Sequence, residues 1–106
     1  MSHIIKKVKA EVVPDVLYHG TASVFLLGIW MRGLINKKSN FVFLTEDRIS
    51  ARRFGQRHGN PIVMTIDCTR MFRDGFDFYK DENGIWMTEY VPPEYISIKT
   101  EYDINE

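Results

Sequence analysis

The chain has 106 residues, of which 44% are apolar and 26% charged, as expected for one soluble globular domain. Its formal net charge is zero, so bulk electrostatics favour neither a nucleic-acid partner nor an anionic membrane. A single cysteine, Cys68, excludes a disulfide within the chain, and no apolar run approaches the roughly 18 residues that a membrane helix requires. No signal-peptide pattern opens the sequence. We therefore expect one cytoplasmic domain over residues 1–106, with loose ends at residues 1–12 and after Tyr102.

The first predicted strand, residues 16–18, ends in a small polar turn. His19, Gly20 and Thr21 place an imidazole, a backbone without a side chain and a hydroxyl where the strand ends. Thr21 can cap a following helix, and Gly33 can end it. That helix is apolar nearly all round its circumference, so we expect it to lie between layers or to be partly covered by a partner.

A second predicted strand, residues 41–45, leads into a second helix. Asp47 is the expected N-cap of this helix, which runs to about residue 58 and stops at Gly59. Helical spacing predicts an inward face and a solvated ridge: Ala51, Phe54 and His58 face inward, and Arg48 and Arg52 face solvent.

The rest of the chain reads as short strands, at residues 61–66, 76–80, 85–88 and about 96–101. Asn83-Gly84 is a strong hairpin signal, and Pro92-Pro93 requires a bend before the last strand. Five or six short strands and two early helices predict an α+β domain, because no predicted helix separates the later strands.

An ordered series of short motifs carries a resemblance to a known family. The series comprises Leu17-Tyr18-His19-Gly20-Thr21, Gly33-Leu34, Val42-Phe43-Leu44-Thr45, Arg57-His58-Gly59-Asn60-Pro61, Ile66-Asp67, Met71, Asp74-Gly75, Phe78-Tyr79, Asn83-Gly84-Ile85-Trp86-Met87-Thr88 and Val91-Pro92-Pro93-Glu94-Tyr95-Ile96. It resembles the C-terminal, NAD-binding lobe of the tRNA 2′-phosphotransferase family, over about residues 16–98. The resemblance implies an ADP-ribosyltransferase-like fold with a split two-sheet core.

The resemblance also implies a binding site for NAD, which is a substrate in this family. His19 matches a histidine that bonds a ribose hydroxyl, and the Gly20 backbone matches one that holds the nicotinamide amide. Arg57 matches an arginine that can hold a phosphate. Four further positions match residues around the nucleotide: Thr21, Thr45, Ser50 and Phe54. No histidine or cysteine spacing indicates a metal site.

Several positions depart from the family pattern. Only about 15 residues precede the His-Gly-Thr strand, so we expect the family's N-terminal lobe, with its Arg-His pair, to be absent. Ser39 stands at the position of a family arginine, and Phe41 and Phe43 stand at the positions of two family histidines. Removal of a 2′-phosphate needs cations around the dianion, so we expect no phosphotransferase activity from this chain alone.

Glu89 lies just before Val91-Pro92, where many ADP-ribosyltransferases carry a catalytic glutamate. There a carboxylate can stabilise the positive charge that develops as nicotinamide leaves. An outward-facing glutamate at a strand end is an equal alternative.

Three functions follow as hypotheses. The first is an NAD-dependent ADP-ribosyltransferase that modifies RNA or protein, as a toxin or phage effector, with Glu89, His19 and Arg57 as catalytic residues. The second is an RNA 2′-phosphotransferase-like protein that needs a partner lobe. The third is a non-catalytic module that binds NAD or RNA ends. For all three we expect a homo-oligomer or partner protein to cover the helix that carries Trp30.

Overall fold

The computed structural model describes residues 7–36 and 40–98. Along the chain the elements alternate between short strands and short helices. In order they are β1 (Lys7–Lys9), β2 (Val16–Ala22), the 3₁₀ turn η1 (Ser23–Phe25), α1 (Leu26–Arg32), β3 (Leu34–Ile35), β4 (Val42–Leu44), α2 (Arg48–Gln56), β5 (Pro61–Asp67), α3 (Cys68–Arg73), β6 (Phe78–Asp81), β7 (Trp86–Thr88), β8 (Tyr90–Val91), the 3₁₀ turn η2 (Pro93–Tyr95) and β9 (Ile96–Ile98).

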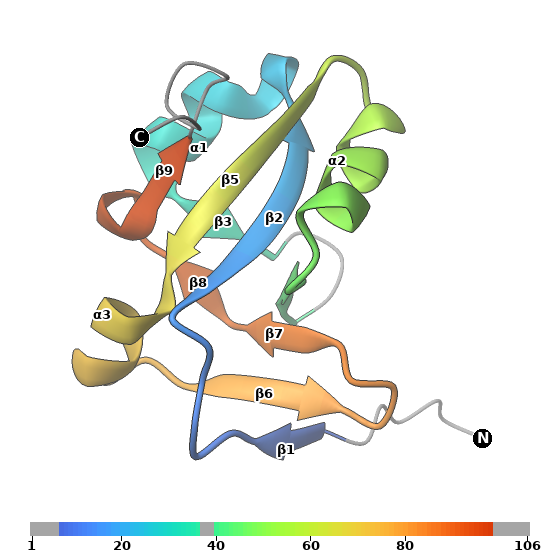
Figure 1. The fold of residues 1–106 in the computed structure, drawn as a ribbon. Helices are drawn as coiled ribbons and strands as arrows, with labels where there is room; N and C mark the ends of the chain where they lie inside the picture. The colour runs from blue at the N-terminus through green and yellow to red at the C-terminus, as the bar shows by residue number, and fades with distance from the viewer. Residues whose placement is uncertain (1–6, 37–39, 99–106) are drawn as a thin grey trace, which may run out of the picture.

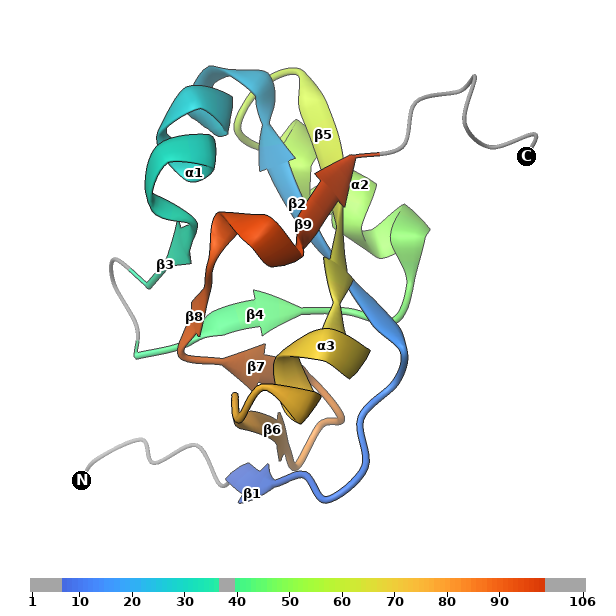
Figure 2. The same ribbon diagram turned by 90° about the vertical axis from the view of Figure 1, so that its left-hand side faces the viewer.

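The strands form small antiparallel sheets rather than one continuous sheet. One sheet has the order β1-β6-β7-β4, a second has the order β2-β5-β9, and β3 pairs with β8. The β2-β5-β9 sheet lies above the other large sheet, with α2 along one side and α1 along the other (Figures 1 and 2). The predicted α+β class is therefore confirmed.

One pair of hydrogen bonds joins the two larger sheets. The Tyr18 amide donates to the Thr45 carbonyl at 2.7 Å, and the Thr45 amide donates to the Tyr18 carbonyl at 2.9 Å. This bridge holds the end of β4 beside the middle of β2, next to His19.

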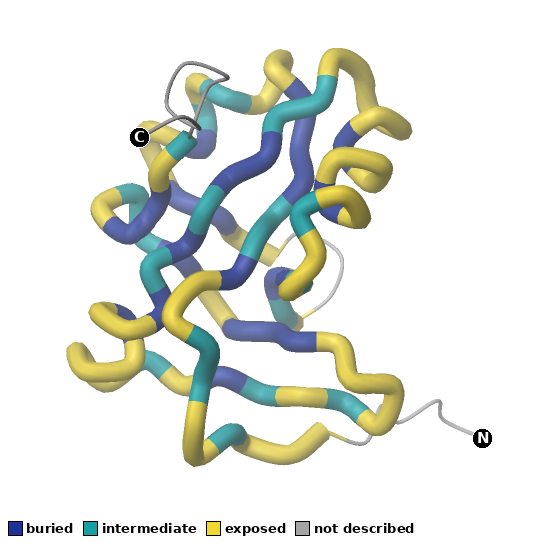
Figure 3. Tube along the Cα trace, in the orientation of Figure 1, coloured by how far each residue is buried: buried dark blue, intermediate teal, exposed yellow. Residues whose placement is uncertain are grey.

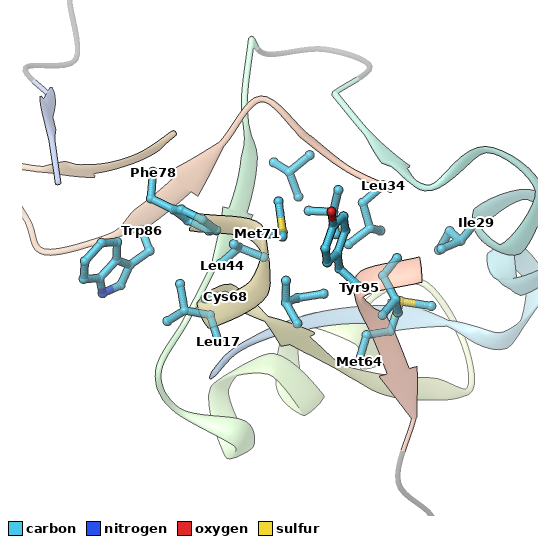
Figure 4. Close-up of a cluster of buried hydrophobic side chains, with 14 residues drawn as sticks. Leu17, Ile29, Leu34, Leu44, Met64, Cys68, Met71, Phe78, Trp86 and Tyr95 are labelled. Carbon is cyan, nitrogen blue, oxygen red and sulfur yellow. The ribbon is translucent and has the colours of Figure 1, made fainter. Parts of the chain in front are cut away.

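The core lies between the sheets and beneath the helices. The buried stretches follow β2, β5 and β7, whereas the outer faces of the helices are exposed (Figure 3). In the close-up of the core, Phe78 and Trp86 lie at one end, Ile29 lies at the other, and Tyr95 lies between them (Figure 4). Among the described residues, no helix has the length and hydropathy that a membrane crossing requires.

The first helix differs from its prediction. Thr21 lies inside β2 and is buried, so it does not cap the helix, and Ala22 precedes η1 without a side-chain cap. The first turn is a 3₁₀ turn, which is common at the start of an α-helix. Gly33 ends the helix as expected, with a φ of 84° that favours glycine.

The second helix begins as predicted and ends two residues early. The Asp47 side chain accepts a hydrogen bond from the Ile49 amide and caps α2. Ala51 and Gly55 form its buried face, whereas Phe54 and His58 are exposed, which corrects the predicted inward face. Exposure of Phe54 and His58 leaves both rings free to line a surface cavity.

Several short elements were not predicted, among them β1, β3, α3 and β8. Residues 7–9, expected in a loose end, form β1 against β6, and Leu34–Ile35 form β3 against β8. The six residues of α3 are capped by Asp67, whose side chain accepts from the Arg70 amide. The predicted hairpin at Asn83-Gly84 is confirmed between β6 and β7. The end of the last predicted strand and the segment after Tyr102 lie outside the described residues.

Candidate functional site

His19 lies in the middle of β2 with one ring nitrogen already engaged. Its Nδ1 is 3.0 Å from the Phe43 carbonyl oxygen. Because a carbonyl only accepts hydrogen bonds, Nδ1 carries the proton and Nε2 keeps a lone pair. Burial lowers the pKa of His19 from its usual 6.5, and the hydrogen bond to Phe43 opposes this shift in part. The imidazole is therefore neutral near pH 7, with Nε2 as an acceptor for a ligand hydroxyl.

Gly20 is required by the packing of β2 against α2. A Cβ atom at Gly20 would lie 1.7 Å from the Ala51 carbonyl oxygen, and one at Gly55 would lie 2.3 Å from the Thr21 carbonyl oxygen. Real side chains never approach backbone this closely. The two glycines thus let strand and helix backbones touch at two points, and this contact places His19 beside α2.

The hydroxyls of Thr45 and Ser50 shape the start of α2. Thr45 Oγ1 accepts from the Asp47 amide at 3.0 Å, and Ser50 Oγ donates to Asp47 Oδ2 at 2.6 Å. The Ser50 hydrogen bond is the main cause of the lowered pKa of Asp47. Thr45 still has its own hydroxyl proton to donate, and Ser50 still has lone pairs to accept with, so both can reach a ligand.

Two cavities meet at His19. One has a volume of about 620 Å³ and follows α1, and the other has a volume of about 830 Å³ and follows β4 and the β6–β7 turn. Both are lined by His19, Gly20, Leu34, Ile35 and Phe54. The pair therefore forms a long depression with His19 at its centre, which suits an elongated ligand made of two parts.

The walls of the two cavities differ in chemistry. The cavity along α1 is mostly apolar and includes Arg32 and His58. The cavity along β4, here called the β4 cavity, has aromatic walls and two carboxylates, Glu46 and Asp47. Phe41 and Phe43, which stand where the resemblance places two histidines, both line the β4 cavity.

The structure brings most of the predicted site residues to these cavities. His19, Gly20 and Phe54 line both, Thr21 lines the cavity along α1, and Thr45 and Ser50 line the β4 cavity. Arg57 is outside both linings, with its guanidinium 5.7 Å from the Phe54 ring centre. Their roles toward a ligand stay predictions.

Glu89 lies on the connection between β7 and β8, is exposed, and lines neither cavity. Its carbonyl oxygen accepts a hydrogen bond from Asn36 Nδ2 at 2.9 Å. Asn36 itself lines the β4 cavity, so Glu89 is near this wall through its backbone. A catalytic role for its carboxylate stays a prediction.

Sequence reasoning missed Glu46 and Arg48. Glu46 accepts a hydrogen bond from Trp86 Nε1 at 2.7 Å, across 40 residues of sequence. Arg48, expected in solvent, is half-buried and lies 5.7 Å from the centre of the Tyr18 ring. Glu46 directly follows Thr45, a predicted site residue, and this position could have pointed to a site role for Glu46. The neighbouring acidic residue, Asp47, was predicted as a helix cap, so an acidic residue at this place did not by itself indicate a site.

The comparisons with known proteins agree on one family. The profile described as "RNA 2'-phosphotransferase, Tpt1 / KptA family" matches residues 1–90. A probable RNA 2′-phosphotransferase of Pectobacterium atrosepticum is 40% identical over 88 residues, which are 83% of this chain and 49% of that protein. Similar proteins of the same name come from Acaryochloris marina, 44% identical over 82 residues (77% and 45%), and Flavobacterium johnsoniae, 41% identical over 92 residues (86% and 50%).

This chain spans about half the length of the curated relatives that it matches. The match nevertheless covers most of the chain, including β2 with His19, the β4 strand and α2. The resemblance carried by the ordered motifs is thereby confirmed. The chain belongs to the RNA 2′-phosphotransferase, Tpt1 / KptA family.

Proposed function

We propose that this chain is the NAD-binding half of an RNA 2′-phosphotransferase-type protein, with an ADP-ribosyltransferase-like fold. Family membership supports NAD as a substrate. The observation that carries the proposal is the arrangement at His19, where a neutral imidazole stands at the junction of two cavities and its Nε2 has no hydrogen-bond partner among the described residues. Such an acceptor suits a ribose hydroxyl, and the two cavities suit the two halves of a dinucleotide.

Removal of an RNA 2′-phosphate requires positive charge near the phosphate. No lysine or arginine among the described residues lines the β4 cavity. Phe41 and Phe43 give this cavity apolar walls at the positions of two family histidines. Ser39, which occupies the position of a family arginine, lies outside the described residues. Two arginines are candidate phosphate ligands: Arg32, which lines the cavity along α1, and Arg57, whose guanidinium lies 5.7 Å from the Phe54 ring centre. We therefore propose that removal of an RNA 2′-phosphate needs cationic groups from a partner lobe.

The alternative of ADP-ribose transfer to a macromolecule receives less support. The relatives are named probable RNA 2′-phosphotransferases, and nothing in their names points to a toxin. The carboxylate expected to support that reaction, Glu89, lines neither cavity. The phosphotransferase-like alternative is thus preferred over the toxin hypothesis.

The experiment that tests NAD binding is a thermal unfolding titration. A ligand that binds the folded state raises the midpoint, by an amount that grows with its concentration above Kd. His19→Ala should remove most of the shift, whereas Arg52→Ala, on the exposed face of α2, should keep it. An unshifted wild-type midpoint at millimolar NAD would contradict the proposal.

Activity is tested by incubating the chain with NAD and a 2′-phosphorylated RNA. We expect the phosphate to remain on the RNA when the chain is alone. Loss of the phosphate would show that the chain is a complete enzyme and would overturn the need for a partner lobe. Transfer of label from NAD to RNA or protein would restore the ADP-ribosyltransferase hypothesis.

A further inference from the structure

Two carboxylates line the β4 cavity, and only one of them is fully used by the fold. Asp47 caps α2: its Oδ1 accepts from the Ile49 amide at 3.1 Å and its Oδ2 accepts from Ser50 Oγ at 2.6 Å. Glu46, the preceding residue, takes no part in this cap. Its position in the cavity wall therefore needs another explanation.

Glu46 is held in place by the wall itself. Trp86 Nε1 donates to Glu46 Oε2 at 2.7 Å, and Trp86 is only 6% exposed, so the indole gives the carboxylate a fixed anchor. Oε1 makes no hydrogen bond within the described part of the chain. When one oxygen of a carboxylate is anchored, the other oxygen can pair with a positive charge of a ligand or accept a hydrogen bond from a ligand hydroxyl.

The surroundings favour a flat ring that carries positive charge. The rings of Tyr18, Phe43, Phe54 and Trp86 line the β4 cavity, and the faces of aromatic rings attract cations. One of these rings already binds a cation of the protein, since Lys80 Nζ lies 5.0 Å from the Trp86 ring centre. No lysine or arginine from residues 7–36 and 40–98 lines this cavity. The carboxylate and the aromatic faces thus both attract a cationic ring.

We infer that Glu46 is a specificity-determining residue that makes the site prefer the oxidised dinucleotide NAD over the reduced form NADH. The nicotinamide ring of NAD is a pyridinium cation, whereas the ring of NADH is uncharged, and the two molecules are otherwise alike. This inference rests on the proposed NAD site. It specifies that the nicotinamide ring binds in the β4 cavity and that Glu46 distinguishes a charged ring from an uncharged one.

The test is a calorimetric titration of the full chain with NAD, NADH and ADP-ribose, in wild type and Glu46→Gln. Glutamine can still accept from Trp86 Nε1 but carries no charge, so the variant removes only the electrostatic contribution. Because the charge pair would be partly exposed, we expect the affinity for NAD to fall by about fivefold, with the affinities for NADH and ADP-ribose within about twofold of wild type. Glu94→Gln, the same change at an exposed site on η2, should alter none of the three.

A second measurement avoids any variant. Raising the salt from about 0.05 M to about 0.5 M screens the contribution of Glu46, so the ratio of the NADH and NAD dissociation constants should move toward one in wild type. The phosphates are common to both ligands, so their own salt dependence cancels in the ratio.

The outcomes separate this inference from the proposed function. Glu46→Gln weakening all three ligands alike would show that Glu46 only supports the cavity wall. An unchanged NAD affinity in Glu46→Gln, or a wild-type ratio that does not respond to salt, would reduce Glu46 to a partner for the indole. Both results leave the NAD site standing. If wild type binds none of the three ligands, the proposed function fails and this inference fails with it.

Discussion

The helices α2 and α1 flank the same strand, β2, but they attach to the fold in different ways. α2 has a carboxylate cap at Asp47 and touches β2 backbone to backbone at Gly20 and Gly55. α1 begins with an uncapped 3₁₀ turn and buries only Ile29, while Val24, Leu27 and Met31 are 74%, 72% and 69% exposed. α2 therefore fixes the geometry at His19, whereas α1 offers an apolar surface that the described residues do not cover.

The sharpest test of this difference is one substitution made in each helix. Gly55→Ala forces a methyl group to 2.3 Å from the Thr21 carbonyl oxygen, so we expect a loss of about 2 kcal/mol or more in the free energy of unfolding. Gly28→Ala in α1 meets only the flexible end of Arg32, and alanine favours helix by up to about 1 kcal/mol. Urea unfolding measures both. Equal losses would mean that α1 is packed as tightly as α2.

A smaller effect is expected from the cap of α2. Asp47→Ala removes the acceptor for the Ile49 amide and the partner of Ser50, so the urea midpoint should fall, by less than in Gly55→Ala. Asp47→Asn keeps an oxygen that can cap the helix and should recover most of the midpoint. If both variants match wild type, the N-terminus of α2 is held by packing alone.

The pH dependence of stability tests the environment of His19. The folded-state pKa of His19 is lowered from 6.5, so below that pH the unfolded chain binds a proton that the folded chain resists. Stability should be complete above 6.5 and should decline as the pH falls from 6.5 toward the folded-state pKa. Urea unfolding at about pH 7.5 and about pH 5.5 should show a smaller decline in His19→Gln than in wild type. Equal declines would place the effect on other groups.

The smallest effect on folding is expected on the exposed face of α1. Leu27→Glu should change the free energy of unfolding by no more than about 0.5 kcal/mol, because the side chain has few contacts to lose. It should nevertheless abolish self-association if this face forms a homo-oligomer, as sedimentation at micromolar concentration would show. Ile49→Glu is the matched control, since Ile49 is 63% exposed on α2. A wild-type chain that stays monomeric would leave a partner protein as the remaining candidate for this face.

The sequence predicted the features that depend on local chemistry. The Asp47 cap, the Gly33 stop and the Asn83-Gly84 hairpin are each set by residues within a few positions of one another, and all three are confirmed. The ordered motifs also identified the family, because they sample nearly the whole chain. Short elements such as β1 and α3 were missed, since three and six residues carry too little periodicity.

Contacts between distant residues account for the rest. Glu46 and Trp86 are 40 positions apart, and no local pattern in either segment predicts their hydrogen bond. Gly20 was assigned to ligand binding, and its packing against Ala51 became visible only once α2 was in place. Thr21 followed the rule for helix caps, but pairing with Ile62 in the β2–β5 ladder kept it in the strand. Tertiary pairing thus overrode the local preference.

The bridge between Tyr18 and Thr45 has a consequence for how such a site can diverge among relatives. Tyr18 is the residue before His19, and Thr45 is the residue before Glu46, so one pair of backbone hydrogen bonds sets the spacing of these two candidate site residues. Backbone pairing is indifferent to side-chain identity. Loops that line the cavities can therefore change in length and composition while the imidazole and the carboxylate keep their separation. The lining of the two cavities can thus change among relatives without any change in the backbone frame that carries His19 and Glu46.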